Sequence, residues 1–494
     1  MSDTPPLQSP IYWQWRPMLL ITWVGLLSYF PMAQAYVWAI DDYPLSQMAR
    51  VGGVEYLGNA FQERGFWRLL QHGLVGWILN RGPWLPGILA IGSHILTCQF
   101  FFLVFRRLGG NQDDVLLLAI IAACSPFGFQ AVTWTSALPY VLSSLILWLS
   151  IWMFLRVNSI PNWAWLIWGL IFAASLLVHE HLMFALFFVA GAAWLMTPQA
   201  DSWRTWLKPS IRWVPPLMAC LYLVVYVLFK PQDHPLYFEP HFHWPALLSP
   251  MVNLWQWLDI WAPFSSASLW QIAASEWPLG WFGLGLCILA GVAALWMAPA
   301  APNEINVIDK GQGKRVMIAM LILFLLASLI YVPAGGFSLD SRKRYPLFLF
   351  LLGGGGMAVL TWGRGVILRW PHWQKRAAMS LLITALMLAC WLHAGLWRAE
   401  ARATRLLSDF LAANPRYHQV YAGKLVDPAK ISPATLRLHG QPWILTHYVR
   451  QPFEMDHPGQ VQPDIKDAPS PCIPSLRYDY RSREWKVLPS SVVP

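Results

Sequence analysis

The stretch MLLITWVGLLSYFPMAQAYVWAIDDY, residues 18–43, contains a long apolar run that ends abruptly in two acids. Residues 18–40 carry no charged side chain, and Asp41 and Asp42 follow directly. A helix of about 20 apolar residues, rising 1.5 Å per residue, crosses the ~30 Å hydrocarbon core of a bilayer. We therefore predict a first transmembrane helix over residues 18–40, with an acidic pair at its end.

The composition extends this prediction to the whole chain. Of 494 residues, 56% are hydrophobic and only 12% are charged, whereas an ordinary globular protein has about 25% charged residues. This excludes a disordered chain and a conventional soluble enzyme. The sequence predicts an all-α polytopic membrane protein with about eleven transmembrane helices, at residues 18–40, 84–105, 115–131, 138–155, 163–178, 182–196, 213–229, 281–297, 316–332, 345–362 and 379–396.

The distribution of Lys and Arg predicts the orientation. Loops on the side of the N-terminus hold 14 of the 35 basic residues, loops on the other side hold 8, and the rest follow residue 396. By the positive-inside rule the N-terminus is cytoplasmic and the C-terminus lies outside. The net charge of +10 includes no run of five basic residues, so we expect no nucleic acid partner. As an alternative start, Ala33-Gln34-Ala35 resembles a signal-peptidase site, whose cleavage would leave the later topology unchanged.

Two long outer loops and a polar tail complete the chain. Residues 41–83 mix apolar and charged residues at near-helical spacing, which predicts one or two helices lying in the membrane interface. Residues 230–280 are rich in Trp, Pro and His, and the stretch MVNLWQWLDIWAPF (251–264) predicts another interfacial helix. Residues 1–396 would form the membrane domain, and residues 397–494 an extracytoplasmic domain. Its first part continues the last span as an amphipathic helix ending near Asn414, and short apolar runs at 418–423 and 442–449 suggest a small α+β appendage.

Several features together resemble the polytopic GT-C glycosyltransferases, which take sugars from polyprenyl-phosphate carriers. They are the acidic pair after the first span, the interfacial first loop and the outer C-terminal domain. The stretch GLIFAASLLVHEHLMFALFFV (169–189) is similar to a family segment in which a helix ends in a polar group. YVPAGGFSLDSRKRYPLFLFLLGG (331–354) is similar to the family's late outer turn, and the resemblance covers most of residues 18–396.

The resemblance implies a general base at the acidic pair. Asp41 or Asp42 would take the proton from an acceptor hydroxyl as its oxygen attacks the anomeric carbon. The sequence leaves open which of the two is the base, and the other could orient it, bind the sugar or hold a divalent cation, as in some family members. No cofactor is required by the pattern.

The resemblance also implies residues that bind the substrate. Arg342, Lys343 and Arg344 would neutralise the leaving lipid phosphate, with Arg64 and Arg68 as weaker candidates. These cations could instead snorkel to lipid headgroups. His179 and Glu180 would line the sugar-phosphate pocket, or they could simply form an interfacial turn. We predict no metal site there, because His179 and His181 do not share a helical face.

The predicted function is transfer of a sugar from a polyprenyl-phosphate donor to a lipid-linked, polysaccharide or protein acceptor at the periplasmic face of a bacterial inner membrane. A transporter or flippase of lipid-linked saccharides is the alternative from another class, and a polymerase or ligase is a related enzyme. A transporter is expected to place polar residues within several spans. Here nearly all charges lie at span ends, and His94 is one of few polar exceptions.

Overall fold

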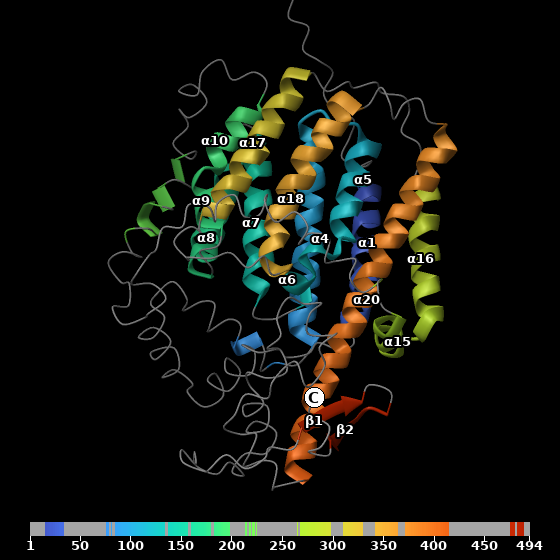
Figure 1. Ribbon diagram of the computed structural model, residues 1–494. Coiled ribbons are helices and arrows are strands. Elements are labelled where there is room, and N and C mark those ends of the chain that lie inside the picture. Colours follow the sequence, from blue (N-terminus) through green and yellow to red (C-terminus); the bar gives the residue numbers. More distant parts are fainter. Residues whose placement is uncertain are drawn as a thin grey trace, which may run out of the picture.

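The structure of the protein is a computed structural model. The structure describes residues 15–33, 76–78, 81, 84–133, 137–156, 160–178, 182–197, 213–214, 217–218, 220–222, 224, 264, 267–297, 310–329, 341–363, 371–413, 475–479 and 482–488. Long apolar helices packed side by side make up most of these residues (Figure 1).

The described helices form a bundle with an apolar core. Five segments are long and apolar enough to cross a membrane, namely Leu85–Arg107, Leu138–Leu155, Lys310–Leu329, Arg344–Trp362 and Arg376–Ala399. This confirms a helical membrane protein. The helices are α1 (Trp15–Ala33), α4 (Trp84–Arg107), α5 (Gln112–Ala123), η3 (Pro126–Gly128), α6 (Phe129–Thr133), α7 (Leu138–Leu155), α8 (Asn162–Val178), α9 (Met183–Phe187), α10 (Val189–Met196), α15 (Ala267–Ser275), α16 (Gly280–Met297), α17 (Lys310–Leu329), α18 (Ser341–Ala358), the π-helical η8 (Val359–Gly363) and α20 (His372–Ala413).

The two ends of the bundle differ in their charged groups. At one end, which we call the basic end, α4 finishes with Arg106 and Arg107 and α17 begins at Lys310. The side-chain amide of Gln312 donates to the Leu108 carbonyl across 2.8 Å, which ties the two helix ends together. At the other end, which we call the hairpin end, α20 runs down to two short strands (Figure 1). The basic end therefore carries Lys and Arg residues that the sequence analysis counted in the loops on the side of the N-terminus.

Most of the predicted spans that fall on described residues match a helix. The ranges 84–105, 138–155, 163–178 and 281–297 agree with α4, α7, α8 and α16 within two residues at each end. The last span continues as one helix of 42 residues to Ala413, so the predicted extension toward Asn414 is confirmed. Most of the two outer loops lies outside the described residues, so their interfacial helices, like the number of eleven spans, stay predictions.

The predicted span over residues 115–131 is wrong as a single helix. Helix α5 ends at Ala123 after 12 residues, about 18 Å, and η3 and α6 follow as separate short pieces. Pro126 lacks an amide hydrogen and cannot continue the helical hydrogen bonds. The chain therefore breaks inside the bundle. The predicted span over 182–196 is likewise divided, between α9 and α10 at Phe188.

Some of the 32 tryptophans lie in the core and not at the membrane boundary, where this side chain is usually enriched. Trp148, Trp165, Trp168 and Trp391 are among the largest fully buried side chains. Buried indoles need a hydrogen-bond acceptor, and Trp168 Nε1 donates to Ser150 Oγ across 2.8 Å. An aromatic belt alone therefore does not account for the tryptophan content.

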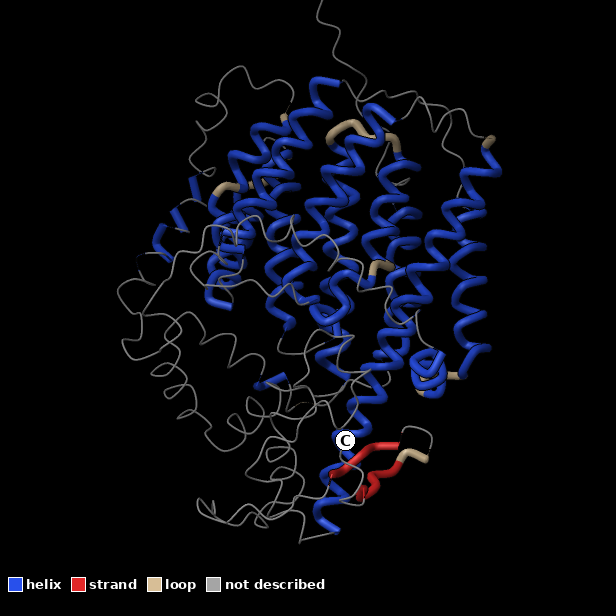
Figure 2. Tube along the Cα trace, viewed as in Figure 1, coloured by secondary structure: helices blue, strands red, loops and turns tan. Residues whose placement is uncertain are grey.

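Two antiparallel strands, β1 (Ser475–Asp479) and β2 (Glu484–Leu488), form the described part of the C-terminal tail beyond α20 (Figure 2). Their register pairs Ser475 with Leu488 and Asp479 with Glu484. The predicted strands at 418–423 and 442–449 lie outside the described residues. The hairpin was not predicted, and the fold of the appendage stays a prediction.

Candidate functional site

The break after α5 frees backbone carbonyls inside the bundle, where an unpaired carbonyl is costly. Three successive carbonyls each accept a hydrogen bond from a side chain of a different helix: Ala123 from His94 of α4 (3.1 Å), Cys124 from Cys390 of α20 (3.2 Å) and Ser125 from Tyr29 of α1 (3.0 Å). The broken helix is therefore held by three other helices. This explains why polar side chains lie so deep in an apolar core.

His94 also reaches α18 through its second ring nitrogen. Its Nε2 lies on the Ala123 carbonyl, which only accepts, so the network assigns the ring proton to Nε2. Nδ1 is then an acceptor, and the Tyr345 hydroxyl donates to it across 2.8 Å. The Tyr29 ring packs edge-on against His94, with 5.1 Å between ring centroids. His94, one of the few polar residues within the predicted spans, therefore connects α4 with α1 and α18.

The short helix η3 presses against the first turns of α18. A Cβ atom on Gly128 would lie 2.2 Å from Tyr345 Cδ2 and 2.8 Å from Tyr345 Cβ. Only glycine lets the chain approach this closely. One residue earlier, the ring of Phe127 stacks on Phe348 with centroids 4.6 Å apart. The N-terminal part of α18 thus packs against η3 and hydrogen-bonds to His94 through Tyr345.

Three of the predicted substrate-binding residues lie at the start of α18. Arg342, Lys343 and Arg344 all belong to its first turn, and Arg344 is buried, with 7% of its surface exposed. The side chains of Arg342 and Lys343 are not among those the structure describes. Asp41, Asp42, Arg64, His179 and Glu180 lie outside the described residues, so their roles stay predictions.

The end of α1 and the start of α18 lie at the same depth in the bundle. Tyr29, one turn before the end of α1, and Tyr345, which follows Arg344, both contact His94. The last turn of α1 and the first turn of α18 therefore lie in the same layer of the protein.

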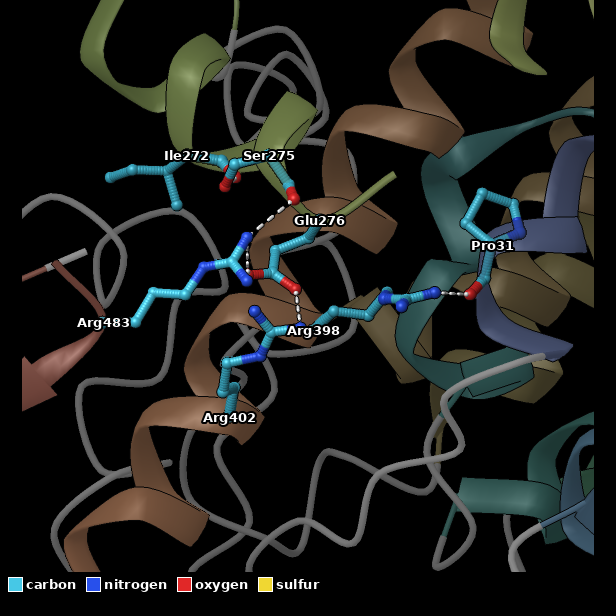
Figure 3. A network of polar contacts seen from close by, with 7 residues as sticks. All are labelled: Pro31, Ile272, Ser275, Glu276, Arg398, Arg402 and Arg483. Carbon is cyan, nitrogen blue, oxygen red and sulfur yellow. Dashed lines mark hydrogen bonds and ion pairs between the residues drawn. The ribbon is translucent and has the colours of Figure 1, made fainter. Parts of the chain in front are cut away.

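A cluster of charged side chains lies nearby at the hairpin end, where α15, α20 and the strands meet (Figure 3). Glu276, directly after α15, pairs with Arg402 of α20 at 2.8 Å and with Arg483 of the hairpin turn at 3.9 Å. Arg398, one turn before Arg402, donates to the Pro31 carbonyl near the end of α1 across 2.8 Å. We call these four charged residues the arginine cluster. It links the hairpin to three helices.

Burial dominates the ionisation of Glu276, whose side chain is only 5% exposed. Loss of hydration raises the pKa of the Glu276 carboxyl above 4.5, although the positive charges of Arg402, Arg483 and Arg398 oppose this rise. The buried carboxylate is thus paired, but its charge remains costly.

We predict that wild type gains stability relative to Glu276→Gln as the pH falls from 7.5 toward 4.5. Between the unfolded-state pKa of Glu276 and its higher folded-state pKa, the folded protein holds a proton that the unfolded chain has released. The stability from this proton is complete below the unfolded pKa and is lost as the pH rises through the folded pKa. Thermal unfolding in detergent at several pH values measures the difference. Glu484→Gln, at an exposed carboxylate of the same hairpin, is the matched control. A difference that shrinks on acidification would show that the ion pairs outweigh desolvation.

Potential metal ligands do not cluster within the described ranges. No three His, Cys, Asp or Glu side chains in that part of the chain lie close enough to hold a metal ion. The acidic pair and the His179–His181 segment are outside it.

The sequence analysis did not predict three features of the structure: the role of Tyr29, the helix break after α5 and the arginine cluster. The break carried a readable signal, since Ser125-Pro126 followed by Gly128 interrupts the apolar run. The arginine cluster carried none, because Glu276 and Arg483 are 207 residues apart in the sequence. No protein-family model matches the chain, and a comparison with curated proteins finds no similar sequence.

Proposed function

We propose that this protein is a membrane glycosyltransferase of the GT-C type with about eleven spans. It would transfer a hexose or pentose from a polyprenyl-phosphate donor to a lipid-linked, polysaccharide or protein acceptor. The reaction would take place at the hairpin end, at the periplasmic face of a bacterial inner membrane, with the N-terminus in the cytoplasm. Two observations support the proposal. The sequence resembles that family, and the end of α1 lies in the same layer of the protein as the start of α18.

One observation carries the proposal. His94 contacts both Tyr29 near the end of α1 and Tyr345 at the start of α18. The end of α1, which the acidic pair follows in the sequence, and the first turn of α18, which holds residues 342–344, therefore lie in the same layer. A base and a phosphate-binding cation must act on the two sides of one glycosyl bond, so they need to share one face of the membrane.

In the proposed reaction Asp41 or Asp42 removes the proton of the acceptor hydroxyl. The acceptor oxygen forms a bond to the anomeric carbon as the bond from that carbon to the donor phosphate oxygen breaks. The leaving polyprenyl phosphate keeps the electron pair, and the cations of residues 342–344 stabilise its charge. His179, Glu180 and Arg64 would help to hold the donor. Atoms and charge balance without a nucleotide or a redox partner.

A transporter of lipid-linked saccharides is the second candidate, and the broken helix favours it. Discontinuous helices often form the substrate site of transporters. In this protein, however, the three freed carbonyls accept bonds from Tyr29, His94 and Cys390. The break is therefore filled by the protein's own side chains, which weighs against a substrate site there.

The test uses the full chain in liposomes with undecaprenyl phosphate carrying a radiolabelled hexose or pentose, plus a bacterial membrane lipid extract as acceptor. We expect loss of the labelled glycosyl bond and label in new products. Label that changes leaflet with its glycosyl bond intact would replace the enzyme proposal with the transporter. If the label is neither transferred to a new product nor moved to the other leaflet, with the hexose donor or with the pentose donor, both candidate functions are wrong.

A further inference from the structure

The arginine cluster carries more positive charge than its described partners neutralise. Three guanidinium groups, from Arg398, Arg402 and Arg483, surround the single carboxylate of Glu276, so the group has a net charge of about +2. Like charges held this close repel one another. An additional anion would lower that repulsion.

The cluster also has a donor that can bind an anion, although Arg483 Nη2 already donates to the Ser275 carbonyl across 3.2 Å. Among the described residues, Arg398 Nε is buried and has no hydrogen-bond partner. The side chains of Arg402 and Arg483 are 35% and 47% exposed, whereas Glu276 is covered. Arg402 and Arg483 are therefore partly open to solvent, whereas the competing carboxylate of Glu276 lies covered between them (Figure 3). A planar guanidinium suits phosphate, since it can donate two parallel hydrogen bonds.

The position along α20 indicates where such a phosphate would come from. The apolar span of α20 ends at Ala399, so Arg398 lies in its last turn and Arg402 just beyond it. Phospholipid headgroups occupy this depth, and long basic side chains at helix ends reach toward them. Arg483 joins the same layer from the turn between β1 and β2.

We propose that Arg398, Arg402 and Arg483 form a binding site for a phosphate group, carried by an anionic phospholipid headgroup or by free phosphate. The bound phosphate bridges α20 and the C-terminal hairpin, and Glu276 competes with it for the same donors. This site is separate from residues 342–344, so it stands or falls independently of the proposed glycosyl transfer.

The test measures binding to the full-length protein in detergent by native mass spectrometry and by ligand-induced thermal stabilisation. The probes are phosphatidylglycerol, zwitterionic phosphatidylcholine as the lipid control, and inorganic phosphate. We expect Arg402→Gln and Arg483→Gln each to weaken binding about tenfold, the order of one charge-assisted hydrogen bond. Arg402→Lys should retain part of the affinity. Arg107→Gln, at an exposed arginine of the basic end, should leave it unchanged.

Glu276→Gln gives an effect of opposite sign, because removing the carboxylate raises the charge that the phosphate meets. We expect this variant to bind phosphatidylglycerol or phosphate several-fold more tightly than wild type does. Preference for phosphatidylglycerol identifies a lipid headgroup site, and saturable binding of inorganic phosphate identifies a site for free phosphate. The proposal is overturned if neither probe binds preferentially. It is also overturned if Glu276→Gln weakens binding as Arg402→Gln does, since the cluster is then only a structural ion-pair network.

Discussion

Asp41→Asn or Asp42→Asn should lower the rate of sugar transfer by about 10²- to 10⁴-fold, the range expected for loss of a general base. An asparagine amide has nearly the same shape as the carboxylate but cannot accept the proton of the acceptor hydroxyl. Donor binding should change far less than the rate, because the proton moves only in the chemical step. The measurement is the initial rate of glycosyl bond loss in liposomes, with donor affinity determined separately.

The chain offers a matched control for this experiment. Asp113 and Asp114 are also adjacent acids, but they begin α5 at the basic end, where carboxylates favourably meet the helix N-terminus. Asp113→Asn should therefore leave the rate of transfer unchanged. If both Asp41→Asn and Asp42→Asn keep full activity, the acidic pair is not the base and the proposed mechanism is wrong. A strong effect of only one of them identifies the base.

The described helices were predictable where apolar length alone decides the structure. Residues 138–155 form the predicted helix without any shift, because a continuous apolar run flanked by polar residues has one stable arrangement in a membrane. The break at Ser125-Pro126 was missed because hydropathy averages over a proline. Its stability depends on hydrogen bonds from Tyr29, His94 and Cys390, which come from distant parts of the chain.

The candidate site was predictable only in part, for a related reason. Sequence shows that Arg344 begins an apolar helix, but not that Tyr345 bonds to His94, 251 residues earlier. Charge counts likewise show basic residues near α20 without revealing that Arg402 and Arg483 share Glu276. Contacts between distant segments follow from packing, which no local pattern encodes.

Gly128→Ala should lower the free energy of unfolding by about 2–3 kcal/mol, a typical cost of forcing an extra methyl group into a packed core. The new Cβ would overlap the ring and the Cβ of Tyr345, so η3 and α18 must separate. That movement should break the bond from Tyr345 to His94. Since Arg344 precedes Tyr345, we expect glycosyl transfer to fall as well. Thermal unfolding and the liposome assay, run on the same preparation, measure both effects.

Two further variants separate steric overlap from a general effect of alanine. Gly191→Ala in α10 places its Cβ in open space, and alanine favours helix over glycine by about 1 kcal/mol, so this control should be neutral or stabilising. Tyr345→Ala removes the ring that Gly128→Ala would strike, so the double variant should lose less stability than the sum of the two single changes. Additive losses would mean that Gly128 and Tyr345 act independently, and the seating of α18 by η3 would then be refuted.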